Sequence, residues 1–286
     1  MKRHKHFNFQ FSIFNLAAAL LLLFAACDTI DSEEYTIYDG APVSWSPAPA
    51  APEAVQRAYI EKYTGPKCNN CPKADRTLDA AHEQIGDRMV VVAINHPTGQ
   101  GIPYPNQPDL RTDGGNAWDR HFGITYLPSI HLNRTELYTG DISGIASNIS
   151  QSLQGTPQAA IGVQAALNGS AVDITVDIQH TLSSTLTLTA AIIEDSLAYR
   201  QLDGAERVDD YVHNHMLRKV ITSYWGADLP AGQNLLRGTL SFTPADDIVL
   251  ENSHIVVFLS DKASRRVINC ASCPLTTDHR PLTTNP

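Results

Sequence analysis

The sequence has no excess of positive charge and no long apolar segment. Lysine and arginine number 21 against 30 aspartates and glutamates, a formal charge of −9, so we do not expect the chain to bind nucleic acid. Its longest apolar run is far shorter than the roughly 20 residues that a transmembrane helix needs. Hydrophobic residues make up 43% of the 286 residues. That is enough for a substantial core, and the length suits two domains of ordinary size.

Cysteine is also scarce, and its five positions differ in kind. Four cysteines form two C-x-x-C pairs, Cys68 with Cys71 and Cys270 with Cys273. The fifth, Cys27, closes an apolar N-terminal stretch. The pattern therefore separates one candidate anchor cysteine from two pairs with candidate redox or structural roles.

The first 26 residues have the features of a lipoprotein signal peptide. Basic Lys2, Arg3 and Lys5 precede an apolar core over residues 16–24, and two alanines come just before Cys27. We expect cleavage before Cys27 and lipidation of that cysteine, because several acyl chains hold a protein stably on a membrane. The alternative is an ordinary exported protein that is cut nearby, with Cys27 buried or free.

Residues 27–53 predict a tether. Residues 28–34 are acidic, and residues 41–52 are rich in proline and alanine with little periodicity, a composition typical of a partly extended linker. An acidic stretch directly behind a lipidated cysteine resembles the surface-export signal of Bacteroidetes lipoproteins. It is equally consistent with a solvated leader that has no sorting role.

Residues 54–155 predict an α/β domain. A strand-like run over residues 55–63 leads into the first C-x-x-C pair, residues 73–85 place apolar side chains at helical spacing, and residues 89–94 resemble a buried strand. A strand, a C-x-x-C pair at a helix N-terminus, a helix and a second strand together make a thioredoxin-like unit.

This placement gives the first two cysteines distinct chemical roles. The N-terminus of a helix stabilises a thiolate and lowers the pKa of the thiol, so we expect Cys68 to be the nucleophile. Cys71, one turn inside the helix, would then resolve the mixed disulfide. Lys67 adds a cation beside Cys68.

Pro128 is the candidate for a cis-proline beside the cysteines. It precedes an apolar strand expected over residues 129–132, and thioredoxin-like proteins resemble this arrangement. A cis X-Pro bond there would expose the preceding backbone to a bound chain. Residues 143–153 predict the closing helix of the domain. The insertion at residues 96–112, rich in proline and glycine, either shapes a cleft near the cysteines or is decoration.

Residues 156–286 predict an all-β domain. Residues 171–178 alternate apolar and polar side chains, and residues 185–193 and 254–259 are further strand-like runs. Asn168-Gly169 marks a hairpin. Because half-buried antiparallel strands explain this pattern, we expect a β-sandwich.

Cys270 and Cys273 follow a short strand expected at residues 265–268. We first expect a local disulfide that secures the C-terminal strand, because exported proteins oxidise their thiols. One alternative is a relay that exchanges with Cys68. Another is a zinc site shared with Cys68 and Cys71.

His213 and His215 are two residues apart, a spacing at which both face the same side of a strand and can ligate zinc or copper. No third ligand is evident nearby. We therefore expect these histidines, with Arg218, to stabilise a turn and the entry to a strand. The sequence predicts no metal and no other cofactor.

Three segments resemble one protein family. They are residues 61–74 with the pattern Thr-Gly-x-x-Cys-x-x-Cys-Pro, Leu127-Pro128-Ser129 with Asn133-Arg134, and residues 211–218 followed by Trp225-Gly226. They resemble the outer-membrane-protein-28 related family of Bacteroidetes lipoproteins. The resemblance implies a thioredoxin-like domain followed by an immunoglobulin-like sandwich, at the outer membrane.

The first segment departs from ordinary thioredoxins. No tryptophan precedes Cys68, and Asn69-Asn70 replaces the usual Gly-Pro. Glu61 shares a strand face with Tyr63 and is the candidate for the buried carboxylate that assists proton transfer. A surface glutamate, or one that pairs with a helix cap, fits the sequence better.

Two functions fit these features. The first is an outer-membrane-anchored lipoprotein that acts as a binding or adhesion module and keeps its C-x-x-C pair as a structural disulfide. The alternative is an extracytoplasmic thiol-disulfide oxidoreductase that uses Cys68 and Cys71. The binding module is favoured because the usual Trp and Gly-Pro context is missing, and whether the chain is an enzyme stays open. Its partners would be the membrane, through lipid on Cys27, and a protein or thiol substrate at the periplasmic or cell-surface face.

Overall fold

The computed structural model of the chain describes residues 40–140 and 142–275. The expected signal peptide at residues 1–26, Cys27 with its expected lipid, and the first part of the expected tether lie outside these residues. Within the described part, no helix combines the length and the apolar character needed to cross a bilayer.

The described residues form a mostly β structure with a few helices. The helices are α2 (Cys71–Ile85), η1 (Gly86–Arg88), η2 (Gly99–Gly101), α3 (Asp113–His121), α4 (Ile145–Ser152) and η3 (Leu250–Asn252). The strands are β1 (Ser44–Pro47), β2 (Ala58–Thr64), β3 (Met89–Asn95), β4 (Ser129–Leu132), β5 (Glu136–Thr139), β6 (Ala159–Asn168), β7 (Ala171–His180), β8 (Leu186–Glu194), β9 (Leu197–Asp203), β10 (Glu206–His213), β11 (Met216–Val220), β12 (Ala227–Asp228), β13 (Leu235–Phe242), β14 (Ser253–Asp261) and β15 (Val267–Pro274).

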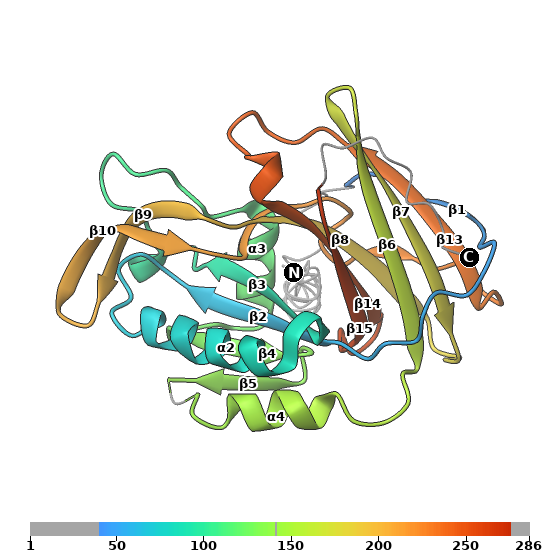
Figure 1. Ribbon diagram of the computed structural model, residues 1–286, viewed down its shortest axis with the longest axis horizontal. Coiled ribbons are helices and arrows are strands. Elements are labelled where there is room, and N and C mark those ends of the chain that lie inside the picture. Colours follow the sequence, from blue (N-terminus) through green and yellow to red (C-terminus); the bar gives the residue numbers. More distant parts are fainter. Residues whose placement is uncertain (1–39, 141, 276–286) are drawn as a thin grey trace, which may run out of the picture. The chain divides into compact units, whose positions relative to one another are not determined.

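The strands are gathered in two main sheets and one separate hairpin (Figure 1). The large sheet has the order β15-β14-β8-β11-β3-β2-β4-β5, with β12 paired to β8. The second sheet has the order β1-β13-β7-β6, and β9 and β10 pair with each other as a two-stranded hairpin. Each sheet therefore draws its strands from distant parts of the sequence.

Two parallel strands, β2 and β3, form the centre of the α/β part. All seven residues of β2 are buried, and the register pairs Ala58 with Met89. The connecting helix α2 places Ala74 and Leu78 in the same core as Ile60 of β2. A parallel pair needs such a crossover, and burial on both faces explains the continuous apolar run of β3.

The elements expected in this half are present with small changes in their bounds. The helix predicted at residues 73–85 is α2, which begins two residues earlier, and the strand predicted at residues 89–94 is β3. The strand predicted at residues 129–132 has the bounds of β4. The helix predicted at residues 143–153 is α4, and the strand predicted at residues 55–63 is β2.

A β-sandwich follows the α/β part. The alternating residues of β7, among them Val172, Ile174 and Val176, face a core that also contains Leu188 of β8 and Val257 of β14. The expected hairpin joins β6 to β7 at Gly169, whose φ of 63° suits a residue without a side chain. The four-stranded sheet thus packs on one face of the β8 and β14 part of the large sheet.

Strands β8 and β14 are buried on both faces. In β8, Ala190 and Ile192 point into the sandwich core, whereas Ala191 and Ile193 point into the core that holds β2 and β3. In β14, Val257 faces the sandwich core and its neighbour Phe258 faces the other one. Strands from both sides of the boundary expected at residue 155 therefore lie in one sheet.

One part of the range expected to be a tether is a strand. Within residues 27–53, the segment Ser44–Pro47 forms β1 and pairs with β13, with Trp45 opposite Gly238. Proline does not exclude this placement, because Pro47 ends an edge strand.

Candidate functional site

The first C-x-x-C pair lies at the junction of β2 and α2. Cys68 belongs to the turn that leaves β2, Cys71 is the first residue of α2, and the two form a disulfide with Cα atoms 5.4 Å apart. The turn is closed by a hydrogen bond from Cys68 N to Gly65 O of 3.0 Å. A Cβ at Gly65 would lie 2.4 Å from the carbonyl oxygen of Gln100, so the motif needs glycine there.

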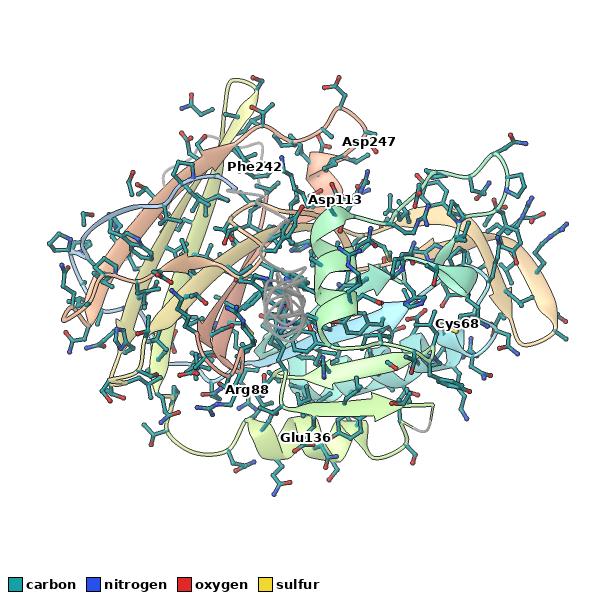
Figure 2. The ribbon with its side chains drawn as sticks, turned by 180° about the vertical axis from the view of Figure 1, so that it is seen from behind. Cys68, Arg88, Asp113, Glu136, Phe242 and Asp247 are labelled. Atoms are coloured by element: carbon teal, nitrogen blue, oxygen red, sulfur yellow. A yellow bond between two sulfur atoms is a disulfide. The ribbon has the colours of Figure 1, made fainter. Side chains whose placement is uncertain are left out.

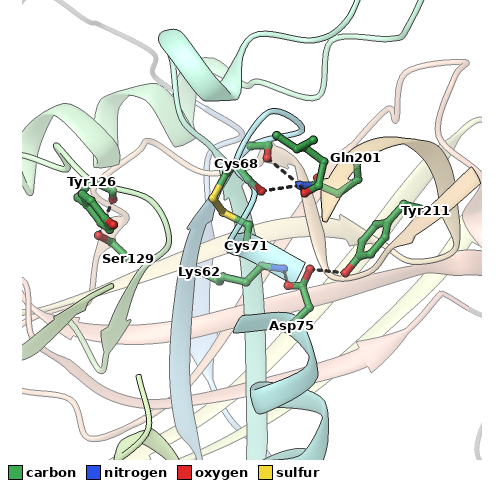
Figure 3. The surroundings of a disulfide bond; sticks show 10 residues. Lys62, Cys68, Cys71, Asp75, Tyr126, Ser129, Gln201 and Tyr211 are labelled. Atoms are coloured by element: carbon green, nitrogen blue, oxygen red, sulfur yellow. Dashed lines mark hydrogen bonds and ion pairs between the residues drawn. A yellow bond between two sulfur atoms is a disulfide. The ribbon is translucent and has the colours of Figure 1, made fainter. Parts of the chain in front are cut away.

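Pro128 lies in the segment that leads into β4, and its bond with Leu127 is cis, the conformation that the sequence indicated. Strand β4 pairs with β2, with Ser129 opposite Tyr63. Leu127 packs in the same core as Cys68 and Cys71, and Figure 3 shows Tyr126 and Ser129 across from the disulfide. The fold thus brings together the three residues for which the sequence predicted a catalytic site.

The disulfide itself is covered. Cys68 is 0% exposed and Cys71 is 1% exposed. The β9–β10 hairpin lies over the loop that carries Cys68 (Figures 2 and 3). The side-chain amide of Gln201 on β9 donates to Cys68 O at 2.9 Å and to Gly65 O at 3.3 Å. Gln201 is itself buried, so these bonds are shielded from water.

Backbone bonds continue this contact along the loop. Leu202 N donates to Pro66 O at 2.9 Å, and Gly204 N donates to Asn69 O at 2.8 Å. Asp203, between them, forms an ion pair of 2.9 Å with Arg76 of α2. Strand β9 therefore binds the C-x-x-C loop much as a neighbouring strand would.

The second strand of the hairpin, β10, contacts helix α2, which begins at Cys71 of the disulfide. Tyr211 of β10 donates its hydroxyl to Asp75 at 2.8 Å, and Asp75 also forms an ion pair with Lys62 of β2 (Figure 3). Burial and the Asp75 carboxylate raise the pKa of Tyr211 above its ordinary value. Desolvation and the Lys62 ammonium lower the pKa of His213 to about 4, so this imidazole is neutral at physiological pH.

Glu61 is buried rather than exposed, which makes the expectation of a surface or cap-pairing glutamate wrong. Its carboxylate accepts hydrogen bonds from Arg134 at 2.5 and 2.8 Å and from the hydroxyls of Tyr59 and Tyr63 at 3.1 Å each. His131 lies opposite on β4, with Nδ1 3.7 Å from Glu61 Oε2. Burial alone would raise the pKa of Glu61, but Arg134 and His131 lower it to about 2.

Arg134 fills a cage of aromatic rings. Its guanidinium carbon lies 4.6 Å from the ring centre of Trp118, 4.9 Å from that of Phe258 and 5.9 Å from that of Trp225. Rings at such distances attract a cation most strongly where water is excluded. Glu61, Arg134 and Trp225 come from three separate segments that the sequence analysis singled out, and the fold joins them.

The disulfide expected between Cys270 and Cys273 is absent, and both thiols are free. The strand expected to end at residue 268 is β15, which continues to Pro274, so both cysteines lie within a strand. Residues three apart on a strand point to opposite faces with Cα atoms about 10 Å apart, too far for a disulfide. Cys270 accordingly joins the core of β2 and β3, whereas Cys273 packs against the sandwich core.

No three ligating side chains among the described residues are arranged to hold a metal ion. His213 ends β10, where its Nε2 is buried and has no hydrogen-bond partner in the described part of the chain. His215 turns toward Asp195, with Nδ1 3.2 Å from Oδ1. The turn role expected for this segment is supported by the φ of 61° at His215 and by its backbone bond to Asp195.

The residues that cover the disulfide were not found from the sequence. Gln201 lies 133 residues from Cys68 and no local pattern marks it. The segment at residues 211–218 is marked in the sequence by its family resemblance and by the spacing of His213 and His215, but the contact of Tyr211 with α2 appears only in the fold. Lys67, expected to act as a cation beside Cys68, lies with its ammonium 5.4 Å from the ring centre of Tyr104.

The chain is similar to one protein family and to several solved structures. Residues 115–278, more than half of the chain, match the family described as outer membrane protein Omp28. The solved structure of HBP35 of Porphyromonas gingivalis is similar with a TM-score of 0.65 and 18% identity, over 82% of this chain and 81% of that one. A structure from Agrobacterium tumefaciens has a TM-score of 0.50 and 19% identity, over 82% of this chain and all of the other.

A domain of the outer membrane lipoprotein Omp28 from Porphyromonas gingivalis aligns over 42% of this chain and 89% of its own length, with 16% identity and a TM-score of 0.32. No curated protein matches the chain. At these identities the structural likeness to HBP35 and to the Agrobacterium tumefaciens protein concerns the fold.

Proposed function

Because the chain belongs to the Omp28 family of outer membrane proteins, we propose that it is a membrane-associated binding or adhesion module built on a thioredoxin-like scaffold. In this proposal the Cys68–Cys71 disulfide stabilises the scaffold and does not exchange with substrates. The burial of both sulfur-bearing residues beneath the β9–β10 hairpin is the observation that carries it.

The thioredoxin-like assignment is supported by the order and pairing of elements. Strand β2, the C-x-x-C turn, α2 and parallel β3 are followed by a cis-proline in front of antiparallel β4. An immunoglobulin-like sandwich over residues 156–286 fits the antiparallel pairing of β6, β7 and β13.

The structural role proposed for the disulfide is supported by the inaccessibility of its sulfur atoms to an attacking thiolate. Exchange requires a thiolate to reach a sulfur atom of the disulfide. Here Cys68 is fully buried, and Gln201 and Leu202 bond to the backbone of its loop. A substrate would have to displace this hairpin before any attack. The resting protein therefore presents a closed surface at the position of a redox site.

A second candidate function is a thiol-disulfide oxidoreductase. The cis bond before Pro128 and the position of Cys71 at the start of α2 favour it, because a helix N-terminus stabilises a thiolate. In that case Cys68 is the nucleophile and the hairpin must open during turnover. The two candidates differ in whether the covered disulfide exchanges at a useful rate.

Insulin reduction by the purified full chain, driven by a dithiol, separates the two. We expect no turnover by the wild type, and activity equal to background in Cys68→Ser. Cys273→Ser serves as the matched control because it removes a free thiol of the sandwich. Turnover that is lost in Cys68→Ser, with mixed disulfides trapped in Cys71→Ser, would overturn the binding module in favour of the enzyme.

We also propose that lipid on Cys27 anchors the chain at the outer membrane. The basic, apolar and small-residue pattern before Cys27 supports this. Replacing Cys27 by alanine should move the protein from the membrane fraction to the soluble fraction. Retention of Cys27→Ala in the membrane would count against the anchor, and protease accessibility of whole cells would report the face.

A further inference from the structure

One edge of strand β3 is left unpaired over its first half. Strand β11 meets β3 only at Ala93, where Ala93 N donates to His215 O at 2.7 Å. On the opposite edge, His96 N donates to Thr64 O of β2 at 2.9 Å. Because successive residues of a strand direct their backbone groups to alternate edges, the N–H and C=O of Val91 point away from β2. Neither group has a hydrogen-bond partner within the described residues.

Two cavities meet along this edge and form one groove. Val91, His82 and His215 line both of them. One cavity extends toward β10 and reaches Val212, a large apolar side chain that is 52% exposed. The other has a volume of about 480 Å³ and extends to Ser272 of β15. The groove is therefore elongated, and Val91 belongs to the part that both cavities share.

The unpaired backbone of Val91 is recessed, since the residue is 6% exposed. A recessed N–H and C=O without partners are unfavourable. A residue of an extended chain carries both a donor and an acceptor, so a peptide that adds to this edge as a strand can pair both groups at once. Its alternate side chains would then meet α2 on one face and the apolar Val90 and Ile193 on the other.

Most charged side chains of the groove already have partners. Lys62 forms an ion pair with Asp75. Asp195 lies 3.2 Å from His215 Nδ1 through one oxygen and 3.3 Å from His254 Nε2 through the other. These side chains therefore offer little free charge to a ligand.

The exposed rim of the groove is acidic. Asp79 of α2 lines one cavity and Asp87 of η1 lines the other, and neither forms an ion pair within the described part of the chain. Arg57 is turned inward, because its Nη1 is buried. Burial raises the pKa of Cys270, and the Arg57 charge opposes that rise from within the core. The rim therefore favours a ligand with basic side chains.

The spacing of the two acidic side chains suits a strand. Asp79 and Asp87 are eight residues apart, which corresponds to about 12 Å along a helix. Residues four apart on a strand are separated by about 13 Å and lie on the same face. Two basic side chains at that spacing can therefore reach both carboxylates from one extended peptide.

From this arrangement we propose that the groove binds an extended peptide with basic side chains four residues apart, paired through its backbone with Val91. The inference rests on the proposed binding function and names the class of partner. The groove does not include the disulfide, so the two can fail separately. Absence of peptide binding by a protein without insulin turnover would overturn the groove alone.

The probe is a rhodamine-labelled peptide with blocked ends and the sequence Lys-Val-Thr-Val-Lys, and fluorescence anisotropy with the full chain in detergent measures its binding. We expect saturable binding. The peptide Glu-Val-Thr-Val-Glu should bind at least about tenfold more weakly, because two attractions become repulsions. N-methylation removes the backbone donor either of threonine or of both valines. One of these two modified peptides should also bind at least about tenfold more weakly, because the donor that faces Val91 O is lost.

Variants of the chain test the same contacts from the other side. Asp79→Lys/Asp87→Lys should weaken binding at least about tenfold. Glu83→Lys/Asp246→Lys makes the same change of charge at exposed positions outside the groove and should bind like the wild type. Ser272 lines the groove from an exposed position of β15, so Ser272→Trp fills the space without altering a charge. We expect it to abolish binding while keeping the melting temperature.

Several results would contradict this assignment. Equal losses in the two charge-reversal variants, full binding by Ser272→Trp, or undiminished binding of both N-methylated peptides would overturn it. Tighter peptide binding after removal of residues 276–286 would assign the groove to that segment of the chain instead. A dimer that dissociates when the peptide is added, measured by analytical ultracentrifugation, would assign it to a second copy.

Discussion

Arg134 Nη2 lies 2.5 Å from Glu61 Oε1, and the two side chains are 1% and 0% exposed. Arg134 follows β4 and Glu61 lies within β2, so the ion pair ties neighbouring strands beneath the cage of Trp118 and Phe258. Removing one partner of a buried ion pair leaves the other charge buried without a counter-charge, which is unfavourable. We therefore expect this ion pair to contribute to the stability of the α/β part.

Removing either partner should destabilise the protein strongly. We expect Glu61→Gln and Arg134→Met each to lower the free energy of unfolding by about 3–5 kcal/mol, measured by urea denaturation. The double variant Glu61→Leu/Arg134→Met should recover part of the loss, because no unpaired charge stays buried. Single variants within 1 kcal/mol of the wild type would show that the pair is not structural.

Loosening the hairpin should expose the disulfide. Gln201→Ala removes the bonds to Cys68 O and Gly65 O, which lowers the cost of local opening by about 2 kcal/mol. We expect the disulfide to be reduced about 10- to 100-fold faster, followed by mass spectrometry after alkylation. Gln179→Ala, at an exposed position of β7, is the control and should behave like the wild type. An unchanged rate in Gln201→Ala would mean that the hairpin does not limit access.

Acidification should weaken the hairpin through His213. The unfolded chain protonates this histidine near its ordinary value of 6.5, whereas the folded protein resists until about pH 4. Stability must then fall as the pH drops through this window, by at most about 3 kcal/mol. We expect the slope of unfolding free energy against pH to be smaller in His213→Gln, which stays neutral. Parallel wild-type and variant curves between pH 6.5 and 4 would refute this assignment.

Cys270 and Cys273 should react as two slow thiols. Burial raises the pKa of Cys270 to about 12 and that of Cys273 to about 11, so little thiolate exists at pH 8. We expect neither to be alkylated readily in the native protein. After denaturation without a reductant, peptide mapping should find both labelled and Cys68 and Cys71 unlabelled. Protection of Cys270 and Cys273 under those conditions would restore the disulfide between them.

The sequence predicted most accurately the features that depend on residues close together along the chain. The β2-α2-β3 unit and the position of Pro128 follow from apolar periodicity and from a C-x-x-C pair at a helix start, all within short windows. The strand that holds Cys270 and Cys273 was predicted too short, because Asn269 and Ser272 interrupt the apolar pattern. Asn269 is in fact buried and donates to the backbone of Val55 and Ala159.

Contacts between segments that are distant along the chain could not be predicted from the sequence. The sequence favours a surface or cap-pairing Glu61 over a buried one, because a buried carboxylate is rare without a partner and its partner Arg134 is 73 residues away. The cover over Cys68 depends on Gln201, whose role requires the β9–β10 hairpin to lie against the loop between β2 and α2. Neither relationship leaves a periodic or spacing signal along the chain.

Because β8 and β14 contribute side chains to both cores, we expect the protein to unfold in one cooperative step. A gene fragment encoding residues 54–155 alone would leave β3 without β11 and would bare the apolar faces of β2 and β3 that Ala191 and Phe258 cover. Such a truncation should aggregate on expression. Any shortened version of the protein therefore has to keep the sandwich strands as well.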